Sequence, residues 1–204
     1  TDETMPYILQ RNESNITFLK RLAARNNFQL RVEEGNLIFK KASFEGSAQT
    51  IEMGENLRSV RFNFNSIDQV QKVVVRGWDI TAKEEIVGEA TSGDVTAIGG
   101  GEIGADVAGA FGESTAYVTD VPVSSQGVAT LIAQAEMERM ARQFCRGTCN
   151  SQGNDKIRAG TMVEFEGIST NFCGSYYVLA TRHVIGVKSG YTTEFTFCSN
   201  TLGS

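Results

Sequence analysis

The chain has 204 residues, enough for one large domain or two small ones with a buried core. Its formal net charge is -5, so no long-range attraction helps it bind nucleic acid. No apolar run approaches the ~20 residues that span a membrane, and no basic-then-apolar segment resembling a signal peptide opens the chain. We therefore expect neither specific nucleic-acid binding nor membrane insertion by this segment.

The first 41 residues predict a helix followed by a β-hairpin. Residues 13–27 carry apolar side chains at helical spacing, Ser14 can cap the helix, and Asn27 can adopt the left-handed conformation that ends it. Residues 28–41 contain two runs of strand formers separated by a glycine-containing turn. Such a helix and hairpin are too small to be stable alone, so we expect them to pack on another part of the protein.

The middle of the chain predicts strands, then a loop, then a second helix. Residues 57–90 contain three strand-like runs. Residues 91–113 are rich in Gly and Ala without a steady period, which indicates a mobile loop or insertion. Residues 124–144 predict an amphipathic helix capped by Ser124 or Ser125.

The last quarter of the chain returns to strands after a polar loop over residues 145–156. Alternating or β-rich runs follow at 161–167, 175–186 and 191–198. Because strands outnumber helices and do not alternate with them, we predict an α+β fold. Its main part is a mostly antiparallel, barrel-like sheet, closed to remove its edges.

Two domains are predicted on this basis. Residues 1–56 form the helix plus β-hairpin element. Residues 57–204 form the barrel-like β domain, into which the loop and helix of residues 91–156 are inserted.

One motif suggests a dinucleotide cofactor. Gly99, Gly101 and Gly104 form a GxGxxG pattern, and Asp120 follows at about the distance of a ribose-binding acid. The preceding residues are short and polar rather than a buried parallel strand, and two later glycines interrupt the following helix. We therefore expect no cofactor, and a nucleotide-binding oxidoreductase is the alternative from a different class.

No other motif predicts catalysis or metal binding. His183 is the only histidine, and Cys145 and Cys149 form a CxxxC pair without a second half for a zinc site. The nucleophile-elbow and zinc-protease motifs do not occur, so a peptidoglycan hydrolase is a weaker alternative. We predict no catalytic, cofactor or metal residues, and free thiols of a reducing cytoplasm.

Residues 73–79, VVVRGWD, read as the end of a strand. Gly77 is expected to permit a bulge, Trp78 to be largely buried, and Asp79 to start a turn.

Three ordered blocks resemble the phage late control protein D family, the tail hub proteins related to the hub region of VgrG spikes. They are RNESNITFLKRLAARNNFQLRVEEGNLIFKK (11–41), VVVRGWDITAKEEIVGEA (73–90), and IRAGTMVEFEG with GSYYVLATRHVIG and GYTTEFTF (157–197). Residues 91–123 match poorly. The positions that carry the resemblance, to which we assign structural roles, are Arg76, Gly77, Trp78, Asp79, Arg182, His183, Gly190, Tyr191, Thr193, Glu194 and Phe195.

The resemblance implies a structural subunit of a contractile-tail baseplate hub, assembled in the bacterial cytoplasm and located in the virion tail. Members of that family form trimeric rings between the tail tube and the spike, so the implied partners are further copies, a tail tube protein and a spike protein. The resemblance also implies a first barrel, which in members of that family would lie before Thr1. A hub of a type VI or extracellular contractile injection system is the alternative within the same fold.

Overall fold

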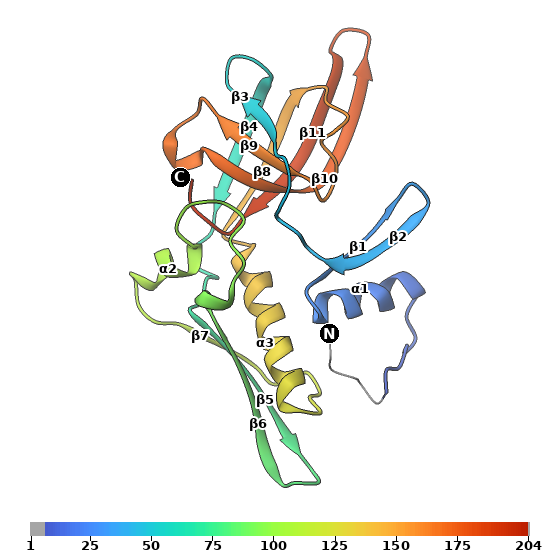
Figure 1. Cartoon of the computed structure of the whole chain (residues 1–204), viewed down its shortest axis with the longest axis vertical. Helices are drawn as coiled ribbons and strands as arrows, with labels where there is room; N and C mark the ends of the chain where they lie inside the picture. The colour runs from blue at the N-terminus through green and yellow to red at the C-terminus, as the bar shows by residue number, and fades with distance from the viewer. Residues whose placement is uncertain (1–6, 204) are drawn as a thin grey trace. The chain divides into compact units, whose positions relative to one another are not determined.

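The computed structural model describes residues 7–203, which form an α+β fold with 11 strands and three α-helices (Figure 1). This confirms the predicted fold class. The residues group into two compact units, each assembled from separate segments and described here by itself. Unit 1 takes its described residues from 7–42, 70–95 and 113–139, and unit 2 from 43–69, 96–112 and 140–203. The division into domains 1–56 and 57–204 stays a prediction.

Unit 1 begins with α1 (Asn15–Arg25), and its ends follow the sequence signals. The Ser14 side chain accepts a hydrogen bond from the Thr17 amide, which satisfies one of the donors left free at a helix start. Asn27 has φ 54°, the left-handed conformation that ends the helix. The predicted helix, its cap and its stop are therefore confirmed.

The hairpin of β1 (Phe28–Glu33) and β2 (Asn36–Lys41) is also confirmed, with antiparallel pairing throughout. The two residues between the strands, Glu34 and Gly35, have φ 51° and 80°. Positive φ at both positions matches the right-handed twist of the flanking strands, which explains the tight two-residue turn.

A three-stranded sheet and α3 (Gln126–Ala141) complete unit 1, although the last two residues of α3 belong to unit 2. The strand order is β6-β5-β7, with β5 antiparallel to β6 and parallel to β7. The bounds are β5 (Lys72–Asp79), β6 (Glu84–Thr91) and β7 (Thr115–Val118). Ser125 accepts from the Val128 amide at 3.2 Å, so it is the helix cap among the two serines that the sequence left open.

Two contacts bind α3 to the sheet. A Cβ on Gly88 would lie 2.2 Å from the Ala129 carbonyl carbon, so glycine is required where the helix backbone crosses β6. The Gln126 side chain accepts a hydrogen bond from the Val87 amide and donates one to the Val87 carbonyl. The side-chain amide thus occupies the edge of β6 as a peptide group of a further strand would.

Unit 2 is built on a curled six-stranded sheet of order β3-β9-β10-β11-β8-β4 (Figure 1). All neighbours are antiparallel except β3 and β9. The ladder ends at β3 and β4, so the sheet is barrel-like without the complete closure that the sequence led us to expect. The bounds are β3 (Gln49–Glu52), β4 (Leu57–Phe64), β8 (Cys145–Gln152), β9 (Met162–Glu166), β10 (Gly174–Gly186) and β11 (Gly190–Ser199).

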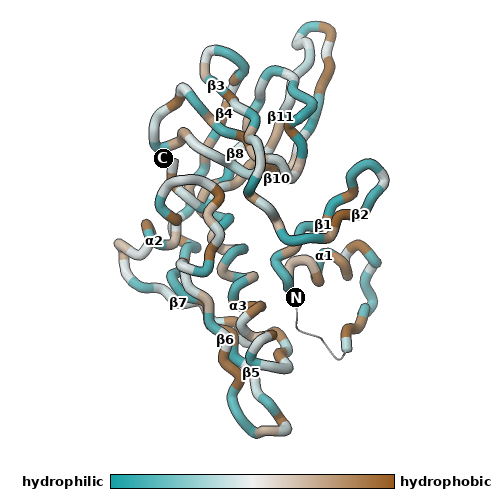
Figure 2. Tube along the Cα trace, viewed as in Figure 1, coloured by the Kyte–Doolittle hydropathy of each residue, from teal (hydrophilic) through white to brown (hydrophobic). Residues whose placement is uncertain are grey.

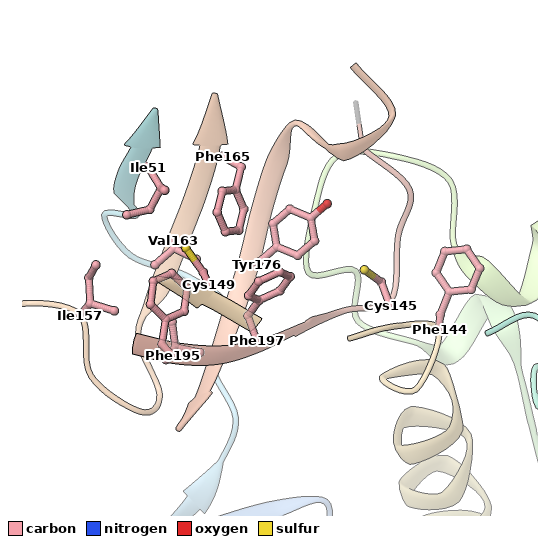
Figure 3. Close-up of a cluster of buried hydrophobic side chains, with 11 residues drawn as sticks. Ile51, Phe144, Cys145, Cys149, Ile157, Val163, Phe165, Tyr176, Phe195 and Phe197 are labelled. Atoms are coloured by element: carbon pink, nitrogen blue, oxygen red, sulfur yellow. The ribbon is translucent and has the colours of Figure 1, made fainter. Parts of the chain in front are cut away.

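Hydrophobic and hydrophilic residues are mixed along these strands (Figure 2), and the buried hydrophobic side chains form an aromatic core. Phe62, Phe165, Tyr176 and Phe197 contact one another, and every pair of these rings has its centroids 5.0 to 5.5 Å apart. Phe165, Tyr176 and Phe197 point toward one another from three strands (Figure 3). Tyr176 keeps its hydroxyl satisfied by donating to the Phe172 carbonyl at 2.9 Å.

Two segments read as loops contain regular structure. Residues 145–152 are β8, a central strand, so the predicted polar loop over 145–156 is wrong there. Within 91–113 the chain forms η1 (Ser92–Asp94) and α2 (Gly104–Gly109), and Ile98 is 5% exposed. Burial in unit 2 orders a segment whose composition alone indicated mobility. A second short 3-10 helix, η2 (Thr170–Phe172), precedes β10.

No helix among residues 7–203 is both long enough and apolar enough to cross a membrane.

The aromatic core yields a stability test. Phe197 is fully buried, so Phe197→Ala should lower the free energy of unfolding by about 3–5 kcal/mol, because it removes a large side chain and leaves a cavity. Denaturant unfolding followed by circular dichroism measures the loss. Phe111 is 87% exposed, and Phe111→Ala is the control that should leave the midpoint unchanged. Equal midpoints for the two variants would contradict the assigned core.

Candidate assembly surfaces

The RGWD block lies on β5, where alternation sends its residues to opposite faces. Val73 and Val75 are fully buried, and a Cβ on Gly77 would come within 1.9 Å of the Val123 side chain. These three residues therefore share the packed face. Arg76 and Trp78 take the other face and are exposed.

Trp78 is 59% exposed, so the prediction that it is largely buried is wrong. The predicted bulge at Gly77 is wrong too, because β5 pairs with β6 in unbroken register from Lys72 to Asp79. Glycine is needed there for the close approach of Val123, and an unbroken register leaves the following residue on the open face. Asp79 does start the turn, because its carboxylate accepts from the amides of Thr81 and Ala82.

Charged and aromatic side chains share this open face. Arg76 lies 3.4 Å from Glu85 and stacks 5.6 Å above the Tyr117 ring. Both partners of the ion pair are about half exposed, so it contributes little to stability. The exposed aromatic side chains of this face make few contacts within the protein.

The later part of the third block, residues 174–197, forms the β10–β11 hairpin in unit 2. Cross-strand register pairs Arg182 with Glu194 and His183 with Thr193, and Phe195 is buried in the core. Gly190 has φ 66°, the left-handed region that the tight turn requires. The hairpin therefore brings Arg182 and His183 together with residues 190–195, and Tyr191 lies opposite Ile185.

His183 is held by hydroxyl groups. Its Nδ1 lies 3.0 Å from the Tyr191 hydroxyl and 3.2 Å from the Thr193 hydroxyl. A hollow of about 360 Å³ beside it is lined by Asp155 and Arg158 among others. Its hydrogen-bond partners within residues 7–203 include no carboxylate, the group that usually orients a histidine base.

The cysteines are free thiols, and three of them are buried. Burial raises the pKa of Cys145 and of Cys149 to about 12, and that of Cys198 to about 11. Such thiols are protonated at neutral pH and are poor nucleophiles and poor metal ligands. Cys145 and Cys149 are separated by four residues along β8, about 13 Å at the usual rise, too far for a disulfide. The described part of the chain holds no cluster of three or more His, Cys, Asp or Glu arranged for a metal ion.

The GxGxxG glycines lie where the chain packs tightly in unit 2. A Cβ on Gly104 would meet the Phe144 ring at 2.1 Å, and one on Gly101 would meet the Leu202 carbonyl oxygen at 2.2 Å. The Gly104 amide donates to the Asn200 carbonyl at 2.8 Å. Gly101 itself lies in a bend, and no parallel strand leads directly into the motif. The glycines are thus explained by close packing against the end of the chain.

The outer face of the curled sheet carries two adjoining hollows of about 610 and 330 Å³, which share Arg61, Thr148 and Thr196. Three arginines line them, Arg61, Arg146 and Arg182, against one carboxylate, Glu194. We call these hollows together the arginine groove.

Sequence reasoning missed the arginine groove because the arginines come from three different strands. One of these strands, β8, was read as a loop. Its alternation is visible once Cys145, Gly147 and Cys149 are taken as an inward row, which leaves Arg146 and Thr148 facing outward.

Residues 1–186 match the Alg8 N-terminal domain family. The chain belongs to this family. Membership by itself specifies no activity, and no curated protein matches the chain by sequence.

Solved structures show that the fold of this family member is also that of tail proteins. A 43 kDa tail protein of a Shewanella oneidensis prophage matches with a TM-score of 0.69 and 14% identity over 93% of this chain. A tail protein of Neisseria meningitidis matches with a TM-score of 0.67 and 11% identity over 94% of this chain. A prophage tail protein of Listeria monocytogenes gives 0.52 and 14% over 93%. The chain spans 56% of the first two proteins and 54% of the third.

The thiol environments predict a graded reactivity. At pH 8 iodoacetamide should label half-buried Cys173 first in the native protein, and the other three only after denaturation, because buried thiols with raised pKa values lack thiolate. Mass spectrometry of peptides measures the order. Equal labelling of all four native thiols would contradict this assignment.

The free energy of unfolding should also fall as pH rises above 9, because the unfolded chain releases thiol protons that the folded state keeps until about pH 12.

The packing of the glycines gives a second test. Gly101→Val should lower the melting temperature, because its side chain would collide with the Leu202 backbone. Isothermal titration of the unmodified protein with NAD, NADP and FAD should give no heat of binding. Micromolar binding that Gly101→Val abolishes without loss of stability would instead support the dinucleotide alternative.

Proposed function

We propose that this protein is a structural subunit of a phage or phage-like tail, and within it of the baseplate hub. The observation that carries the proposal is the agreement of fold with tail proteins over more than nine tenths of the chain. The three late control protein D blocks support the hub assignment independently, because they were found by residue pattern rather than by shape.

The surface of the protein supports a role in assembly rather than in chemistry. Trp78 and Ile80 near the end of the β5–β6 hairpin are 59% and 84% exposed, and Ile185 and Val187 at the end of β10–β11 are 85% and 108% exposed. Exposed apolar side chains grouped at hairpin ends are typical of surfaces that partners cover. Within residues 7–203, in contrast, no carboxylate bonds to His183, and three of the four cysteines are buried thiols with raised pKa values.

The hub role implies a homotrimer, with a tail tube protein on one side and a spike protein on the other, located in the virion tail. Such a subunit can form a closed ring, since head-to-tail contacts close when the rotation between neighbouring copies divides a full turn evenly. A hub of a type VI or extracellular contractile injection system would use the same subunit design, and the neighbouring genes distinguish the two settings.

Assembly state tests the proposal. The full-length gene product, including any residues that flank this chain, should have the mass of a trimer by light scattering coupled to size exclusion. Negative-stain images should show a ring with a central hole. A protein that stays monomeric across a wide concentration range, and forms no ring with its spike protein present, would overturn the hub assignment.

A further inference from the structure

Two exposed surfaces of the chain are complementary in charge. The first is the β5–β6 tip, residues 78–85, whose turn projects beyond α3 (Figure 1). It carries two exposed apolar side chains, Trp78 and Ile80, with three carboxylates against one lysine. The second surface is the arginine groove of unit 2.

The groove is a concave site whose lining matches a segment with both acidic and apolar side chains. Its three arginines are exposed, and only Arg182 has an acidic partner in the groove, Glu194 at a long 3.6 Å. Leu179, the residue displaced by the register shift in β10, adds an apolar surface and is 38% exposed. The groove therefore combines cationic walls with an apolar patch.

An unsatisfied acceptor lies in the groove as well. The Asn150 side-chain oxygen is shielded from solvent and has no hydrogen-bond partner among the described residues. A buried acceptor without a donor costs free energy unless an incoming group supplies one. Because Asn150 lines the groove, a turn of its side chain would bring this oxygen to an inserted donor, and the indole N–H of Trp78 is a donor-only group of that kind.

We infer that the β5–β6 tip of one copy inserts into the arginine groove of the next copy. The two surfaces differ, so the contact is head-to-tail, and such a contact forms a closed ring when the rotation between copies closes. Trp78 is the anchor, because buried tryptophans dominate the binding energy of interfaces. Asp79, Glu84 and Glu85 lie against the arginines and set the register. This inference rests on the proposed function, because it assumes that copies of the chain assemble.

The other exposed hairpin end does not fit the groove. The only charged side chain in the β10–β11 turn is Lys188, and it would repel the three arginines. The β5–β6 tip is the surface whose charge and hydrogen-bonding groups match.

Trp78 is the only tryptophan of these 204 residues, so once any tryptophan in flanking residues is replaced by phenylalanine its fluorescence reports directly on this contact. In the assembled full-length protein its emission should be shifted to shorter wavelength, and dilution to monomers should shift it back. The groove variant Arg61→Glu/Arg182→Glu should keep the long-wavelength emission at all concentrations. Lys20→Glu/Lys40→Glu makes the same charge change on exposed positions outside both surfaces and should behave as the unmodified protein.

Complementation separates this contact from other interfaces. Trp78→Ala should weaken self-association by about 30-fold or more, the range of an anchor residue, while Phe111→Ala should not. Neither defective variant should form rings alone. Mixed together, the Trp78→Ala protein supplies an intact groove and the Arg61→Glu/Arg182→Glu protein supplies an intact tip, so they should form a one-to-one dimer that grows no further. Thermal melts confirm that each variant is folded.

A charge exchange gives the second readout. Glu84→Arg/Glu85→Arg introduced into the groove variant should restore rings. Rings that persist in both defective variants, or a mixture that yields no dimer, would overturn the contact and leave the hub proposal intact. An unmodified protein that forms no assembly with its spike protein present would overturn both.

Discussion

The packing of aromatic rings inside the curled sheet determines the rest of unit 2. Phe62, Phe165, Tyr176 and Phe197 come from four different strands, and each ring contacts the other three. Because side chains alternate along a strand, fixing these inward residues fixes every outward one. The position of Arg61 beside Phe62 on β4 is thus a consequence of core packing. A one-residue slip of register would remove both the core and the groove.

Local signals in the sequence predict unit 1 well where a short segment decides its own structure. The Ser14 cap, the stop at Asn27 and the Glu34–Gly35 turn depend on backbone geometry within a few residues, and each is found. Local sequence signals do not predict contacts between residues that are far apart in the sequence. β7 is only four residues long and pairs with β5 about 40 residues earlier, so no local pattern distinguishes it from a loop.

Residues 145–152 and Trp78 show the same limit at the candidate surfaces. β8 has cysteine, glycine and serine on its inward face, because bulky rings from β4 and β11 already fill the space, and small residues give no strand signal. The burial of Trp78 was predicted from its place between a strand and a turn, whereas its exposure follows from Gly77 and Val123, which fix the packed face of β5. Residue type predicted the elements, and packing partners distant in the chain decided the surfaces.

The Gln126 side chain on β6 has a consequence for how copies of this protein can meet. An uncovered strand edge recruits another strand through its backbone, and such pairing is indifferent to side-chain identity. At Val87 both backbone groups are already taken by a side-chain amide. A sheet sealed at that point cannot extend into a neighbouring molecule there by backbone pairing. If copies meet at this edge, their recognition would depend on side chains, which would make it selective for one partner and resistant to fibrous growth.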